Sequence, residues 1–178
     1  SAGSHTVICE VSPDIAAFSK AIGNGHPIAA IIGKEGVMQA AQDTFMSSTF
    51  WSERVGPAAA LVVIEKHRRL DVSKRLGELG QKVRNAWHQA AQKHGLSIKI
   101  GGILPLSNFT IGGTDMLTIK AYYIQLMLEQ GFLASNAYTA MYAHTDDHVD
   151  SFAKAVDFAF SEIAQAITKG TLIERLEG

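Results

Sequence analysis

The feature that most constrains this chain is a single lysine, Lys20, between two short apolar runs. Ile15–Phe18 lies just before it, and residues 28–32 follow it after a glycine-rich stretch. Neither run alternates apolar with polar side chains, and such short continuous runs predict strands that are buried on both faces. We therefore expect an α/β fold in which helices cover both sides of a sheet and Lys20 stands at the edge of one strand.

A lysine in this setting has two interpretations. A cation at the edge of a buried strand loses hydration, and this favours the free amine, which can attack a carbonyl and form a Schiff base. The same pattern also fits a surface lysine that follows a short strand, with Gly23 and Gly25 in an ordinary turn. Residue types alone leave both interpretations open.

Two ordered motifs favour the first interpretation. The segment around Lys20 resembles the cofactor-lysine segment of class III aminotransferases, which use pyridoxal phosphate (PLP); it reads Pro13-Asp14-Ile15, then Lys20, Gly23-Asn24-Gly25 and Pro27-Ile28-Ala29-Ala30. Further on, residues 47–60 resemble the next signature of that family, a threonine in a loop of small residues followed by an alanine-rich helix. Two motifs in the family's order are more specific than either alone.

The resemblance assigns roles to two residues. Lys20 aligns with the lysine that holds PLP as a Schiff base and later moves the proton between the substrate and the cofactor. Thr49 aligns with the threonine that donates a hydrogen bond to the PLP phosphate of the neighbouring subunit in a homodimer. The expected catalytic residue is Lys20, the expected cofactor-binding residues are Lys20 and Thr49, and no metal site is expected.

The resemblance also implies the domain organisation. Residues 1–56 are expected to be the C-terminal remnant of the large PLP-binding domain, which contains the end of its sheet. Residues 57–95 are expected to form long connecting helices, and residues 96–178 a small α+β C-terminal domain. Periodicity predicts strands at 6–9, 15–18, 28–32, 97–100, 106–111, 132–134 and 140–143, and helices at 34–42, 58–69, 72–94, 115–130 and 146–169.

The chain departs from the family pattern in length. A complete enzyme of this kind is more than twice as long, and the phosphate cup, the aromatic that stacks on the pyridine ring and the acid at the ring nitrogen are not found here. We therefore interpret the chain as a C-terminal portion, and we expect this portion alone to be inactive.

Three functions remain open at this point. The first is a PLP-dependent aminotransferase that acts on an amino donor and a carbonyl acceptor. The second is a 2,1-aminomutase of the glutamate-1-semialdehyde type, because the loop at residues 48–53 resembles that branch most. The third is a folded dimerisation module without chemistry, and a generic α/β small-molecule binder would remain if both motifs were coincidental.

The composition of the chain limits the kinds of partner that we expect it to bind. Sixteen basic residues nearly balance 17 acidic ones, and the chain shows no basic block that would indicate nucleic acid. The longest apolar run, residues 58–64, is too short to cross a bilayer. Cys9 is the only cysteine, which excludes an internal disulfide and fits a small buried side chain better than a reactive thiol. We expect a cytoplasmic protein with no membrane and no nucleic-acid partner.

Other polar patterns have structural interpretations. His144 and His148 have the spacing of a metal pair, but they flank an expected helix start, where capping explains them better. Glu53 and Arg54 are expected to form a solvated ion pair near the loop of Thr49. Gly112 and Gly113 before Thr114 could bind an anion, but a turn before a helix explains them sufficiently.

Overall fold

The computed structural model describes residues 10–113 and 115–177, and these form two compact units with a boundary between Ser73 and Lys74. Each unit is described by itself. The strand predicted at residues 6–9, with Cys9, lies outside the described residues. Among the described helices, none is long and apolar enough to cross a membrane.

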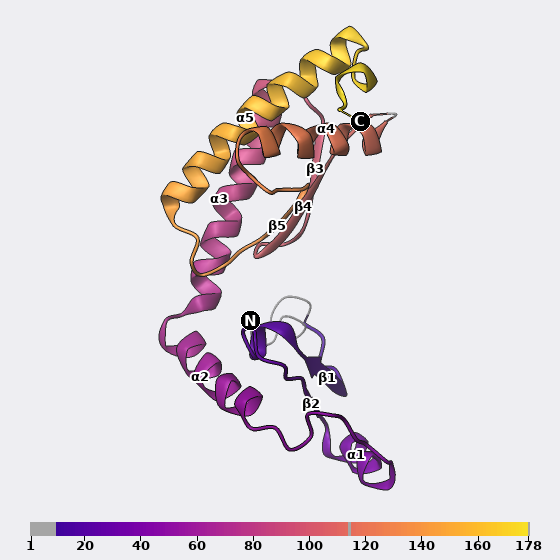
Figure 1. Ribbon diagram of the computed structural model, residues 1–178, viewed down its shortest axis with the longest axis vertical. Coiled ribbons are helices and arrows are strands. Elements are labelled where there is room, and N and C mark those ends of the chain that lie inside the picture. Colours follow the sequence, from indigo (N-terminus) through magenta and orange to yellow (C-terminus); the bar gives the residue numbers. More distant parts are fainter. Residues whose placement is uncertain (1–9, 114, 178) are drawn as a thin grey trace. The chain divides into compact units, whose positions relative to one another are not determined.

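Among the described residues, the first unit contains one antiparallel strand pair, two complete α-helices and two 3-10 helices (Figure 1). Strand β1 (Ile15–Phe18) pairs with β2 (Ala30–Gly33), and the 3-10 helix η2 (Lys20–Ile22) lies between them in sequence. Helix α1 (Glu35–Met38) continues into the 3-10 helix η3 (Gln39–Asp43), and after a loop the unit ends with α2 (Val55–Arg69). The strands and α2 confirm the predicted elements with small shifts of their ends.

The expected burial of these strands on both faces is wrong for the described chain. Ile15 is 53% exposed and Ile31 is 56% exposed. The apolar runs correctly predicted strands, but the described residues of the first unit supply one two-stranded pair and not a sheet covered on both sides.

The second unit is an α+β arrangement. Its elements are α3 (Val72–Lys93, whose first two residues precede the boundary), β3 (Ile98–Ile103), β4 (Leu106–Ile111), α4 (Met116–Glu129), β5 (Ala137–Thr139), α5 (Asp146–Lys169) and the 3-10 helix η4 (Ile173–Arg175). The three strands form an antiparallel sheet in the order β3-β4-β5. The predicted helices at 72–94, 115–130 and 146–169 are confirmed, and Asp115 caps α4 by accepting a hydrogen bond from the Thr118 amide.

Two strand predictions in this unit are wrong. Residues 132–134 and 140–143 are not strands, and the third strand is instead residues 137–139, where Ala137 lies opposite Asn108. Phe132 closes the end of α4 through its amide, which donates to the Met127 carbonyl at 2.8 Å. Phe132 packs against the core and Ala140 is part of it, so their apolar character reflects burial outside any strand.

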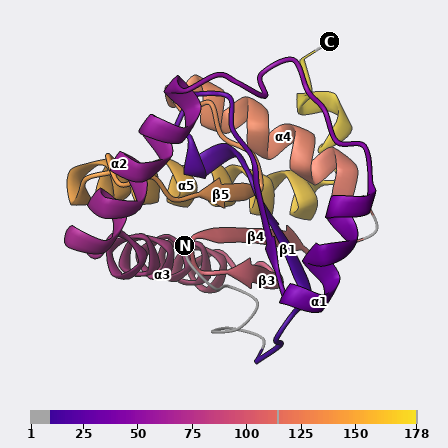
Figure 2. The same ribbon diagram turned by 90° about the horizontal axis from the view of Figure 1, so that it is seen from below.

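One face of the sheet carries the core of this unit. Ser107, Phe109 and Ile111 on β4 are buried, whereas the residues between them are exposed. Figure 2 shows α3, α4 and α5 with this sheet, and all three helices contribute buried residues to one cluster. Phe109 is central, because its ring centroid lies 4.8 Å from that of Trp87 and 5.1 Å from that of Tyr123. Such aromatic contacts add to the stabilisation from buried area.

A polar anchor joins α3 to the turn between β3 and β4. The Arg84 guanidinium donates to the Ser107 hydroxyl at 2.7 Å and to the Gly102 carbonyl at 2.7 Å. The Ser107 hydroxyl donates in turn to the Leu104 carbonyl at 3.0 Å. The buried serine therefore has polar partners, and the anchor fixes where α3 meets the turn.

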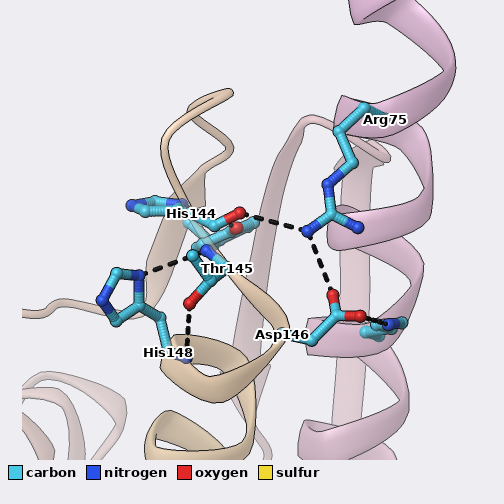
Figure 3. A network of polar contacts seen from close by, with 7 residues as sticks. Arg75, His144, Thr145, Asp146 and His148 are labelled. Carbon is cyan, nitrogen blue, oxygen red and sulfur yellow. Dashed lines mark hydrogen bonds and ion pairs between the residues drawn. The ribbon is translucent and has the colours of Figure 1, made fainter.

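The start of α5 is held by a second polar network (Figure 3). Thr145 and His148 form a capping box, in which the Thr145 hydroxyl accepts from the His148 amide and the His148 ring accepts from the Thr145 amide. The Arg75 guanidinium donates to the His144 carbonyl and to Oδ1 of Asp146. The Nζ atom of Lys82 lies 2.9 Å from Oδ2 of the same carboxylate. Capping thus accounts for His148. No group of three or more possible metal ligands occurs among the described residues.

This network predicts a pH-dependent contribution to stability. Hydrogen bonds from Lys82 and Arg75 hold the pKa of Asp146 below its usual value. A carboxyl whose pKa is lowered by folding stabilises the folded state above its unfolded pKa, and this stabilisation is lost as the pH falls through the folded pKa. We expect Asp146→Asn to unfold at lower urea concentration at pH 7, with a difference that shrinks below about pH 4.

The matched control for this prediction is Asp147→Asn. It removes the same charge from the same helical turn and leaves the contacts of Arg75 and Lys82 in place. Urea unfolding of the three proteins at several pH values provides the measurement. Equal losses in the two variants at pH 7 would show that the helix dipole, and not the ion pairs, explains the effect.

Candidate functional site

Lys20 has an unusual backbone conformation. It lies two positions after the last residue of β1 and begins η2, with a φ of 53°. A positive φ in a residue other than glycine costs about 1 kcal/mol or more, and such strain is concentrated at functional sites. The Lys20 carbonyl accepts hydrogen bonds from the amides of Gly23 and Asn24, both at 3.2 Å. The turn after β1 therefore holds the lysine in this conformation.

Lys20 lines an open pocket of about 570 Å³. The other residues that line the pocket are Ala21, Asn24, Gly25, His26, Pro27 and Ile28. The amide of Asn24 and the imidazole of His26 are the polar side chains among these neighbours, and Pro27 and Ile28 supply apolar surface. The lysine, a nearby amide and an imidazole thus come from one continuous segment, the glycine-rich stretch of the sequence.

The expected loss of hydration at Lys20 is not seen in this chain. The residue is exposed, and the pocket is open to solvent. The described residues form one wall of a site, and this wall brings Lys20 to the pocket but does not shield the residue from water.

The first turn of α2 packs against the same wall. A Cβ atom added to Gly56 would lie 2.6 Å from the Pro27 carbonyl oxygen and 3.1 Å from Ile28 Cβ. Helix α2 also contacts η2, which carries Lys20. Glycine at position 56 therefore allows an approach that a larger side chain would prevent.

Glu53 caps α2, and the expected solvated ion pair with Arg54 is not what the structure shows. Its two carboxylate oxygens accept hydrogen bonds from the amides of Val55 and Gly56. Both hydrogen bonds hold the pKa of Glu53 below its usual value, and the one from the Gly56 amide has the larger effect. The sequence contained a signal for this cap, because an acidic residue preceded a helix that begins near Pro57.

Thr49 lies in the loop before α2. It is exposed and lies within a turn in which the Trp51 amide donates to the Ser48 carbonyl. A second turn follows, in which the Glu53 amide donates to the Phe50 carbonyl. Thr49 is not among the residues that line the pocket of Lys20. The described chain therefore places both predicted residues in one unit but does not bring Thr49 into the pocket of Lys20.

Sequence reasoning missed the ion pair between Asp14 and Lys34. The register of β1 and β2 places Ile15 opposite Gly33, so the two residues just beyond these positions meet at the end of the strand pair. The Lys34 amide donates to the Asp14 carbonyl at 2.9 Å, and the two side chains form an ion pair. The aspartate of the Pro-Asp motif thus closes one end of the strand pair whose two strands lie before and after Lys20 in the sequence.

Comparisons with known proteins give a consistent result. The family model described as aminotransferase class-III matches residues 2–153. The chain is 26% identical over 162 residues to the 2'-deamino-2'-hydroxyneamine transaminase of Streptomyces kanamyceticus, covering 91% of this chain and 41% of that protein. It is also 26% identical to the glutamate-1-semialdehyde 2,1-aminomutase of Desulfosudis oleivorans, covering 86% of this chain and 40% of that protein.

Solved structures agree with the sequence matches. The PLP internal aldimine form of the FumI protein of Sphingopyxis sp. MTA144 matches with a TM-score of 0.83 and 26% identity, over 92% of this chain and 40% of that chain. An omega-transaminase from Sphaerobacter thermophilus matches with a TM-score of 0.77 at 20% identity, which supports the fold alone. The chain spans about 40% of the length of these relatives.

Proposed function

Because the chain belongs to the class-III aminotransferase family, we propose that it is the C-terminal portion of a PLP-dependent aminotransferase in which Lys20 binds the cofactor. The observation that carries the proposal is the place of Lys20, which is held at a positive φ beside an open pocket in the turn after β1. The family match and the FumI structure with PLP support the choice of cofactor.

The residues present fit one side of a PLP site. The pocket of about 570 Å³ has room for the cofactor and offers an amine, an amide and an imidazole beside apolar surface. When bound, PLP would supply an electron sink for the carbon that loses its proton. Lys20 would hold the cofactor through its amine, and the same amine would carry the transferred proton within reach of the carbon that loses it.

The remaining expectations follow from the same assignment. Thr49 is proposed to donate its hydroxyl to the PLP phosphate held by a second copy of the chain, since it is exposed and outside the pocket of its own chain. The substrates would be an amino donor and a carbonyl acceptor, and the working form would be a cytoplasmic homodimer with shared sites. The domain boundaries at residues 56 and 95 remain part of this proposal.

Two alternatives remain. An intramolecular 2,1-amino shift is favoured by the match to the aminomutase of Desulfosudis oleivorans, and it uses the same lysine and cofactor. A dimerisation module without chemistry is favoured by the exposure of Lys20, whose side chain the described residues do not shield from water.

A half-reaction assay on the protein encoded by the complete gene tests the proposal. The protein is incubated with PLP, then with single amino donors in the absence of an acceptor, and release of the keto product is followed together with the PLP absorption. An aminotransferase is expected to release one keto product for each site. A mutase would return the isomerised substrate and accumulate no keto product, and a dimerisation module would not change the PLP absorption.

A further inference from the structure

Glu53 binds the first turn of α2, and this turn contacts the pocket that Lys20 lines. Its carboxylate accepts from two of the amides that an α-helix leaves without partners at its first turn, those of Val55 and Gly56. A carboxylate at this place also complements the positive end of the helix dipole. The first turn of α2 is therefore fixed by a side chain from the loop that carries Thr49.

The turn that Glu53 fixes is the turn that touches the pocket. Gly56 accepts no side chain without a clash, because the Pro27 carbonyl oxygen would lie 2.6 Å from its Cβ. Pro27 and Ile28 are lining residues of the pocket, and the His26 amide closes the same segment by donating to the Gly23 carbonyl at 3.1 Å. A displacement of Gly56 would remove its packing contact with Pro27 and Ile28.

We infer that Glu53 is a positioning residue for the Lys20 site, because its cap holds Gly56 against the Pro27–Ile28 wall of the pocket. Glu53 contacts neither Lys20 nor the cofactor in this role. Its loss frays the first turn of α2 and loosens residues 26–28, so that the amine of Lys20 meets an aldehyde in the productive geometry less often. The effect on PLP rests on the proposed function, whereas the effect on the wall does not.

The experiment compares Glu53→Ala and Glu53→Gln with the control Glu65→Gln. Glutamine keeps one acceptor oxygen without the charge, so it is expected to be intermediate. Glu65 lies further along α2 in an exposed ion pair with Arg69. Removing its charge leaves the first turn of the helix intact.

Two readouts are combined. The first is amide hydrogen exchange at Gly56 and at His26. In the second, the protein is incubated with PLP, the lysine adducts are reduced with borohydride, and the label on Lys20 is compared with the label on the exposed Lys120. We expect Glu53→Ala to accelerate exchange about tenfold at Gly56 and to accelerate it measurably at His26. The labelling ratio of Lys20 to Lys120 should fall at least about threefold, with Glu65→Gln equal to the wild type.

The outcomes separate the two proposals. Faster exchange at Gly56 with unchanged exchange at His26 and an unchanged labelling ratio would overturn the inference, because Glu53 would then cap the helix and nothing more. Wild-type exchange at both amides in Glu53→Ala would also overturn it. All variants are made in the protein encoded by the complete gene. Absence of PLP from Lys20 in its wild-type form would contradict the proposed function, and exchange at His26 would still decide the role of Glu53.

Discussion

Replacing Lys20 with glycine is expected to abolish amino transfer and, at the same time, to stabilise the fold. The amine is the proposed nucleophile and proton carrier, so its loss should lower the transfer rate by at least about a thousandfold. The backbone at position 20 has a φ of 53°. Glycine adopts this conformation without the steric cost of a Cβ atom, and the free energy of unfolding should rise by about 1 kcal/mol.

Lys20→Ala is the matched variant. It removes the amine but keeps the Cβ atom, so it should lose the same activity without the gain in stability. Lys120→Ala removes an exposed lysine from α4 and should change neither quantity. The transfer rate is measured on the protein encoded by the complete gene, and stability is measured by urea unfolding. Retention of more than about a tenth of the activity in both Lys20 variants would contradict the assignment of the lysine.

Opposite effects on activity and on stability are what a strained residue at a functional position would produce. A strained residue persists only where the surrounding structure holds it, and here the turn through Gly23 and Asn24 does so. The glycine-rich stretch that follows Lys20 was visible in the sequence and predicted that turn. The strain itself was not, because lysine is an uncommon residue at a positive φ and nothing in its neighbours specifies it.

Periodicity predicted the long elements well. The helix at residues 146–169 has the same ends in the structure, because a capping threonine at its start and Gly170 in the left-handed conformation at its end are local signals. The third strand of the sheet was predicted wrongly. Ala137–Thr139 has only three residues, and its pairing with β4 depends on contacts that are distant in sequence.

Side-chain contacts across the chain were the least predictable part of the site. Glu53 was expected to pair with its neighbour Arg54, yet it caps α2, because helix amides without partners compete strongly for a carboxylate. The contact of Gly56 with Pro27 depends on how α2 packs against the turn after Lys20. Only three-dimensional structure shows it.

The second large effect is expected at Gly80, where α3 meets the turn between β3 and β4. A Cβ atom at this position would lie 1.9 Å from the carbonyl oxygen of Leu104 and 2.4 Å from its carbonyl carbon. These are backbone atoms of a turn that Arg84 and Ser107 hold in place, so they cannot move aside easily. We expect Gly80→Ala to lower the free energy of unfolding of this unit by about 3 kcal/mol.

Gly77→Ala, one turn earlier on α3, is expected to have the opposite sign. Its added Cβ would approach only the Leu104 side chain, at 3.9 Å, which is an ordinary contact. Alanine is a better helix former than glycine, so this variant should stabilise the unit by about 0.5–1 kcal/mol. Trp87 is fully buried in the core of this unit, and its fluorescence in a Trp51→Phe background can follow urea unfolding of both variants.

Comparing Gly80→Ala with Gly77→Ala separates the effect of the close contact with the Leu104 backbone from the effect of helix propensity. Both substitutions add one methyl group to the interior of the same helix, and they differ in what that methyl group meets. If Gly80→Ala stabilised the unit as Gly77→Ala does, α3 would not pack against the Leu104 backbone as the structure has it. The stability loss from Gly80→Ala is also measured in an Arg84→Ala background. A smaller loss there would show that the hydrogen bonds of Arg84 hold the turn close to Gly80, since a turn without them could move away from the added methyl group.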